Sequence, residues 1–184
     1  METWKDGEHP VNHKKRDIIN NIAEEIRVLL NITKNKFDIE NIVKILNGSI
    51  TKNHYNLDEA AITKSSDDNF EISLSDVSNY QRIRFSIAHE LGHLFLHMHY
   101  LNEEKWNNIE IGTSHARNTN IPYTEYESEA NEFAGAFLMP KSEFIKVANE
   151  NIEDNYYNLK NISDEFDVSI EAVNVRGKTL KLWT

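Results

Sequence analysis

One segment, RFSIAHELGHLFLHMHY at residues 84–100, constrains this chain more than any other because it holds four of the chain's eight histidines. The apolar residues around those histidines predict a helix over residues 80–97. On a helix, His89 and His93 lie one above the other on the same face because they are four residues apart. Two imidazoles in that arrangement can bind one metal ion at about 2.0–2.1 Å. The alternative is a core helix that carries polar residues, but the apolar flanks favour a buried metal site.

Glu90 extends this pair of histidines to the pattern HExxH. Its side chain leaves the helix about 100° around the axis from His89, so it is a poor third ligand. It is placed to reach a water on the metal, and HExxH combines two metal ligands with a general base on one helix. Zinc in an open site acts as a Lewis acid on such a water. We therefore expect Glu90 to take the proton of the water and pass it to a leaving amine.

Three other residues of this segment have different roles. His97 is two turns from His89, roughly 12 Å along the helix, so one ion cannot bind both. We expect His97 to support a ligand or the structure, and His99 to lie off this face and be exposed. Gly92 costs about 1 kcal/mol in a helix interior relative to alanine. A glycine is therefore expected where a substrate or a neighbouring strand approaches the helix closely.

A catalytic zinc site needs a third protein ligand, and the next predicted helix, residues 125–138, supplies candidates. Glu127 and Asn131 are four residues apart on one face, beside alanines that permit close packing. We expect Glu127 to bind the metal, with Glu129 as the competing ligand. Asn131 can hold a ligand histidine through its other ring nitrogen.

The remaining patterns predict an α+β domain. Helices are expected over residues 16–32 and 39–47, the second capped by Asp38 and stopped by Gly48. Three alternating segments, residues 48–55, 60–65 and 70–76, predict two or three short antiparallel strands. Residues 102–124 are expected to form a long loop, and loops of that length are often functional. A short helix capped by Ser142 and two helices joined near residues 167–169 are expected to complete the chain.

The expected architecture is therefore N-terminal helices, a small antiparallel sheet, an HExxH helix packed on a glutamate-bearing helix, and a C-terminal helical hairpin. We divide the chain into an N-terminal extension at residues 1–17, a metallopeptidase domain at 18–153 and a C-terminal helical segment at 154–184. The last segment is either packed on the domain or appended to it.

Composition narrows the classes of function. The chain has no cysteine, so any metal must be held by histidine and carboxylate. No apolar run approaches the roughly 20 residues that cross a bilayer, and the first residues do not form a secretory signal. We expect a cytoplasmic protein with no membrane partner. The net charge of −10 makes direct nucleic-acid binding unlikely, because that affinity comes largely from Lys and Arg.

The combination of RFSIAHELGHLFLH with ESEANEFAGAFLMP resembles the ImmA/IrrE family of zinc metallopeptidases. FDIENIVKILNGSI, FEISLSD and EFDVSIEAVNVRGKTLKLW are similar to other parts of that family, so the resemblance covers most of residues 18–183. It implies a gluzincin-like site with His89, His93 and Glu127 on Zn²⁺ and Glu90 catalytic.

The resemblance also implies a substrate. Members of this family cleave, or trigger loss of, helix-turn-helix repressors that silence mobile-element or stress genes. The chain carries no recognisable repressor domain, so this protein substrate would be supplied in trans. A transition-state oxyanion donor is also needed, and the candidates are His115, Arg117, Tyr123 and Tyr126.

Two alternatives remain open. In the first, zinc is structural and the C-terminal helices, with Arg176, Lys178 and Lys181 near their end, bind DNA or a partner. In the second, the same zinc site belongs to a toxin-like protease with another intracellular target.

Overall fold

The computed structural model describes residues 12–53, 60–75, 79–116 and 125–184. Its helices are α1 (His13–Leu29), α2 (Ile39–Ile45), α3 (Tyr80–Gly92), the π-helix η1 (His93–His97), α4 (Glu103–Asn107), α5 (Glu125–Leu138), α6 (Lys141–Glu150), α7 (Leu159–Phe166) and α8 (Ile170–Thr179). Its strands are β1 (Gly48–Asn53), β2 (Ala61–Lys64), β3 (Phe70–Ser75), β4 (Ser114–Ala116), β5 (Ile152–Glu153) and β6 (Tyr156–Tyr157). The prediction of an α+β fold is confirmed.

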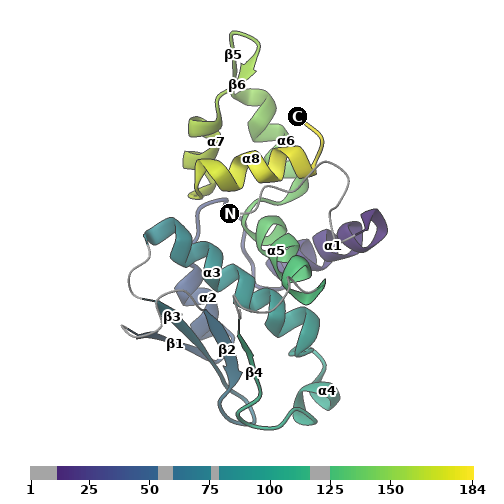
Figure 1. Ribbon diagram of the computed structural model, residues 1–184, viewed down its shortest axis with the longest axis vertical. Helices are drawn as coiled ribbons and strands as arrows, with labels where there is room; N and C mark the ends of the chain where they lie inside the picture. The colour runs from purple at the N-terminus through teal and green to yellow at the C-terminus, as the bar shows by residue number, and fades with distance from the viewer. Residues whose placement is uncertain (1–11, 54–59, 76–78, 117–124) are drawn as a thin grey trace.

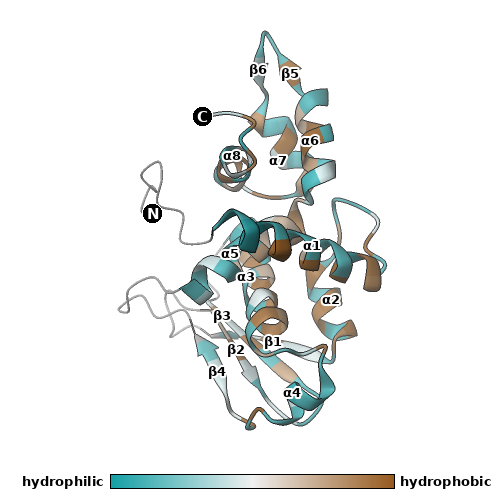
Figure 2. Cartoon of the chain, turned by 90° about the vertical axis from the view of Figure 1, so that its right-hand side faces the viewer, coloured by the Kyte–Doolittle hydropathy of each residue, from teal (hydrophilic) through white to brown (hydrophobic). Residues whose placement is uncertain are grey.

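The elements form three tiers along the longest axis of the molecule (Figure 1). The sheet of β1–β4 with α4 forms one end, and α1, α2, α3 and α5 form the middle. Helices α6, α7 and α8 and the β5–β6 hairpin form the other end. Figure 2 shows the same order from the side, with hydrophobic residues on the helices of the middle tier.

The four-stranded sheet has the order β1-β3-β2-β4 and is mixed. Strand β1 runs parallel to β3, whereas β2 is antiparallel to both β3 and β4. The expectation of a purely antiparallel sheet was therefore wrong. Strand β3 lies between β1 and β2, and Phe70, Ile72 and Leu74 are all buried on one of its faces. Alternation identifies which residues face inward, but it does not specify which neighbour a strand pairs with.

Helices α3 and α5 pack closely because small residues lie between them. A Cβ atom on Gly92 would lie 3.0 Å from Ala130 Cα and 3.1 Å from the Ala130 carbonyl oxygen. A glycine is therefore needed at position 92 because the backbone of α5 passes so close. A neighbouring strand, one of the two reasons that we expected, is not the cause. Helix α1 packs on the other side of α5, so α5 lies between α1 and α3 (Figure 1).

The HExxH helix does not stay α-helical to its end. Its last turn is the π-helix η1, in which the Met98 amide donates to the His93 carbonyl oxygen at 2.9 Å. Such π turns inside α-helices occur frequently at functional sites. His99 follows with a positive φ of 53° and is exposed, which ends the helix.

One predicted helix end is found in the structure, and two others differ from the prediction. The Asp38 side chain accepts from the Asn41 amide at the start of α2, as predicted. Asn47 adopts the left-handed conformation after α2, whereas Gly48 already belongs to β1 and its Cβ position is filled by the Phe70 ring. Helix α6 begins at Lys141 after Pro140, so Ser142 is not its cap.

Residues 102–116 were expected to lie in a loop, and they contain α4 and β4 instead. Trp106 on α4 is 4% exposed, and its Nε1 donates to the Asp67 carbonyl oxygen at 2.6 Å. The buried Lys64 donates to the carbonyl oxygens of Trp106 and Ile109 at 2.9 and 3.0 Å. These long-range contacts order a segment that has no periodicity of its own. The rest of the expected loop, residues 117–124, lies outside the described residues.

The C-terminal tier contains the two predicted helices, α7 and α8. Asp167 between them has a positive φ of 55°, and Ser169 caps α8 by accepting from the Ala172 amide. The expected boundary at 153/154 falls in the turn of the β5–β6 hairpin. At the other end of the chain, α1 already begins at His13 and so takes in part of the expected extension. Among the described helices, none combines the length and the apolar character needed to span a bilayer.

Candidate metal centre and active site

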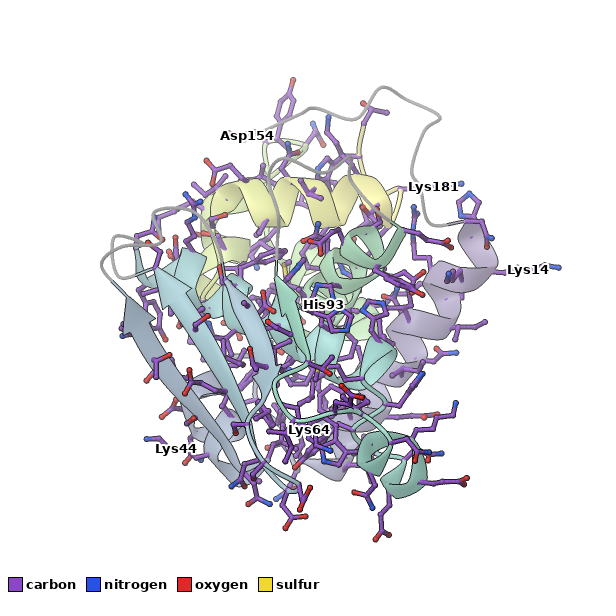
Figure 3. The ribbon with its side chains drawn as sticks, turned by 60° about the horizontal axis from the view of Figure 1, so that its bottom comes forward. Lys14, Lys44, Lys64, His93, Asp154 and Lys181 are labelled. Carbon is purple, nitrogen blue, oxygen red and sulfur yellow. The ribbon has the colours of Figure 1, made fainter. Side chains whose placement is uncertain are left out.

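Three side chains from two helices converge at the centre of the molecule. His89 Nε2 and His93 Nε2 lie 3.1 Å apart at the junction of α3 and η1. The Glu127 carboxylate of α5 lies 3.3 Å from each of them, with Oε2 toward His89 and Oε1 toward His93. Figure 3 shows His93 between the sheet and the helical tier. The exposed fractions of the two histidine side chains are 4% and 2%, and that of the glutamate is 16%.

The outer nitrogens of both histidines have polar partners that fix the tautomers. His89 Nδ1 lies 2.9 Å from Asn131 Oδ1, an oxygen that only accepts, so this nitrogen carries the proton. His93 Nδ1 lies 2.9 Å from His97 Nδ1, and His97 Nε2 lies 3.3 Å from Glu129 Oε2. A neutral His97 that donates to Glu129 must accept from His93. In this assignment both inner Nε2 atoms are unprotonated.

The centre therefore brings together two imidazole lone pairs and a carboxylate, which is a set of acceptors. Burial by itself would raise the pKa of Glu127, but its contacts with His89 and His93 lower it below the usual range of a carboxyl group. Three acceptors this close repel one another unless a cation or a proton lies among them. The group is thus compatible with a metal ion.

The spacing also fits zinc. Three ligand atoms held at about 2.0–2.1 Å from one tetrahedral ion lie roughly 3.3–3.4 Å from one another. The observed separations are 3.1, 3.3 and 3.3 Å. If these three residues held zinc, they would match the three protein ligands of catalytic zinc sites, which keep one position open for water or substrate.

Glu90 is next to His89 on α3, and its exposed fraction is only 1%. It leaves the helix about 100° around the axis from His89, so it is beside the ligand set and not part of it. A buried carboxylate at the edge of a metal centre is the group that HExxH chemistry uses as a base.

His97 and Glu129 lie behind the ligands. Burial and the neighbouring His93 and His115 rings lower the pKa of His97 to about 3, so its ring is neutral at neutral pH. Glu129, which we considered as a competing metal ligand, pairs instead with His97 and with Lys15 of α1.

Of the four candidate oxyanion donors, two lie among the described residues. His115 is on the edge strand β4, and its ring stacks on His93 with centroids 5.4 Å apart and an interplanar angle of 18°. Tyr126 packs on the His97 ring at 4.5 Å and is 57% exposed. Arg117 and Tyr123 lie outside the described residues.

The sequence analysis did not identify Lys15, which lies near the centre in the structure. Its ammonium group contacts both Glu125 and Glu129, and the hydrogen bonds to these carboxylates raise its pKa. The contact joins residues more than 100 positions apart. The only local signal is the spacing of Glu125 and Glu129, four residues apart on one helix face, which would suit a shared cation.

A buried His–His–Glu centre on an HExxH helix, packed between a small sheet and a second helix, defines the class of HExxH metallopeptidases. A family model described as the IrrE N-terminal-like domain, peptidase family M78, matches residues 58–178. The chain therefore belongs to this ImmA/IrrE family of metallopeptidases. A comparison with curated proteins gave no significant match. The matched span begins before β2 and ends in α8, so α1 lies outside it.

Proposed function

We propose that this chain is a zinc-dependent endopeptidase that cleaves a helix-turn-helix transcriptional repressor and so derepresses mobile-element or stress genes. The observation that carries the zinc centre is the convergence of His89, His93 and Glu127 at tetrahedral spacing. Membership of the family supports the peptidase activity and the ImmA/IrrE type of substrate. The cytoplasm is the compartment in which such a repressor is found.

Each residue of the centre has a defined task in this proposal. His89, His93 and Glu127 would hold Zn²⁺, which would supply Lewis-acid activation of water and of the scissile carbonyl. Glu90 takes the proton of the attacking water and delivers it to the leaving amine. Asn131 keeps the His89 ring in the tautomer that presents Nε2 to the centre.

Of the two described oxyanion candidates, His115 is the one whose ring is found to stack on a ligand side chain. Its ring stacks on His93, and burial lowers its pKa, so it is neutral and carries one N–H group. A donor at the edge of the centre can stabilise the charge that develops on the scissile carbonyl oxygen.

The test uses the wild type, Glu90→Gln and His89→Ala. Elemental analysis should give one zinc per chain for the wild type and Glu90→Gln, and little for His89→Ala. A purified helix-turn-helix repressor encoded beside the gene is then incubated with each protein, and fragments are identified by mass spectrometry. We expect cleavage by the wild type alone. Equal cleavage by Glu90→Gln would remove Glu90 as the base, and an intact repressor with the zinc-loaded wild type would refute the proposed substrate.

The structure argues against the alternative in which the C-terminal helices bind DNA, because one of the three cations on which it rests, Arg176, is buried. Arg176 is 3% exposed, and its guanidinium contacts Glu132, Asn20 and the Met139 carbonyl oxygen. An arginine held in this way is not available for a phosphate. A toxin-like protease with another target would use the same centre, and the repressor assay distinguishes the two.

A further inference from the structure

We propose that α1 takes part in the metal centre through a positioning chain, Lys15–Glu129–His97–His93, that holds the His93 ring in its ligand orientation. The inference rests on the proposed function, because it concerns the metal affinity of that same centre. Each link is a direct contact. Lys15 contacts Glu129, Glu129 Oε2 lies 3.3 Å from His97 Nε2, and the Nδ1 atoms of His97 and His93 are 2.9 Å apart.

The hydrogen bonds in this chain have a fixed direction because one of its members, Glu129, can only accept. An ionised Glu129 carboxylate only accepts, so His97 must donate to it through Nε2–H. The neutral His97 ring then has a lone pair at Nδ1, which accepts a hydrogen bond from the Nδ1–H of His93. The proton on Nδ1 leaves the Nε2 lone pair of His93 directed at Glu127 and His89. A carboxylate behind a ligand histidine fixes its tautomer and ring orientation in this way, here through one intervening ring.

Glu129 needs a cation to hold this position. Its side chain is 8% exposed, and a carboxylate that has lost most of its water is stabilised by a nearby positive charge. Lys15 supplies that charge from α1, with its side chain 37% exposed. The same ammonium group also contacts Glu125, one turn earlier on α5. Because the Glu125 side chain is 60% exposed, this second contact contributes little, and the effect of Lys15 on the centre passes through Glu129.

Helix α1 is anchored independently of Lys15. Asn20 Nδ2 donates to Glu132 Oε1 at 2.7 Å, and Arg176 donates to Asn20 Oδ1 at 2.7 Å. Arg16 adds a contact of 3.4 Å to Glu132 Oε2. Removal of the Lys15 ammonium group should therefore leave α1 docked on α5, which separates positioning from folding.

Two consequences are specific to this arrangement. The centre depends on a helix outside the span that matches the family model, residues 58–178. The dependence on Lys15 must also pass through Glu129. A variant that lacks Glu129 should consequently gain nothing from Lys15.

The experiment measures zinc affinity and zinc dissociation rate in the full chain by competition with a chromophoric chelator. The variants are Lys15→Met, Lys15→Arg, Glu129→Gln, His97→Phe and the double variant Lys15→Met with Glu129→Gln. Phenylalanine at position 97 retains a ring for the contact with Tyr126 but has no nitrogen. The matched control is Lys14→Met, because Lys14 is the neighbouring lysine and points away from the protein (Figure 3).

We expect His97→Phe and Glu129→Gln to weaken zinc binding by about 10–100-fold, the usual loss when support for a ligand histidine is removed. Lys15→Met should fall at the lower end of that range, with Lys15→Arg and Lys14→Met close to the wild type. The double variant should bind zinc as weakly as Glu129→Gln alone, because coupled residues are not additive. The metal-free Lys15→Met protein should lose some thermal stability, because Glu129 loses its cation, but it should still unfold in one cooperative transition with α1 folded.

Long-range ¹H–¹⁵N spectra of the metal-free protein give a second readout, because they show which ring nitrogen of His93 is protonated. The wild type should be protonated at Nδ1, and His97→Phe should show both tautomers.

The possible failures are distinguishable. A wild type that binds zinc through His89 while Lys15→Met binds it within twofold of the wild type would overturn the positioning chain and leave the proposed function intact. Additive losses in the double variant would also overturn it. A wild type that binds no zinc would overturn both.

Discussion

Replacement of Gly92 by alanine tests whether the close approach of α3 and α5 sets the geometry of the metal centre. Gly92 lies between the two ligand histidines, and its added Cβ would be 3.0 Å from Ala130 Cα, 3.1 Å from the Ala130 carbonyl oxygen and 3.3 Å from Phe133 Cβ. Two of these neighbours are backbone atoms, which cannot move without a shift of α5. Because α5 carries Glu127, such a shift separates the glutamate from the histidines.

The expected change in stability has two opposing parts. Alanine is favoured over glycine in a helix interior by about 1 kcal/mol. An extra methyl group in a closely packed interface costs about 1–3 kcal/mol. The contacts here are at the short end of the range for a real Cβ atom, so we expect a net loss of roughly 1 kcal/mol in the free energy of unfolding. We expect zinc affinity to fall by about tenfold, the lower end of the loss that follows when the support of a metal ligand is disturbed.

Gly135→Ala is the matched control because Gly135 is also a helical glycine, in α5. The nearest atom to its added Cβ would be Arg176 Cδ at 4.0 Å, an ordinary contact. This variant should gain up to about 1 kcal/mol of stability, with unchanged zinc affinity. Denaturant unfolding of the metal-free proteins gives the first quantity, and chelator competition gives the second. A Gly92→Ala protein as stable as Gly135→Ala, with zinc affinity equal to the wild type, would refute the reasoning.

Three further predictions concern other parts of the structure. His115→Phe should keep zinc and lower kcat by about 10²–10³-fold if His115 is the oxyanion donor, and an unchanged kcat would exclude that role. Lys64→Met removes the donor to two buried carbonyl oxygens and should cost about 1–3 kcal/mol in denaturant unfolding, whereas the exposed Lys44→Met should change little. Burial raises the pKa of Tyr100, so the unfolded chain loses this proton first and the free energy of unfolding should fall as pH rises past about 10. Tyr100→Phe should weaken this pH dependence, as measured by unfolding at several pH values, and leave the part due to Tyr80, whose pKa burial also raises.

The sequence by itself determined the elements with a local repeat. His89 and His93 share a face because a helix turns every 3.6 residues, and the same rule puts Glu127 beside Asn131. Those spacings were enough to predict two facing helices and a metal centre. The alternation of Phe70, Ile72 and Leu74 identified the inner face of β3 in the same way.

Only the tertiary structure decided how these elements meet. Three of these contacts join residues far apart in the chain. They are the pairing of β1 with β3, the pairing of β2 with β4, which carries His115, and the contact of Lys15 with Glu129. Local spacing carries no information about such partners, since any strand edge or surface lysine satisfies the local rule equally well. The close approach of α3 to α5 fixed which side chains of α5 face the histidines and which side of α5 remained for α1.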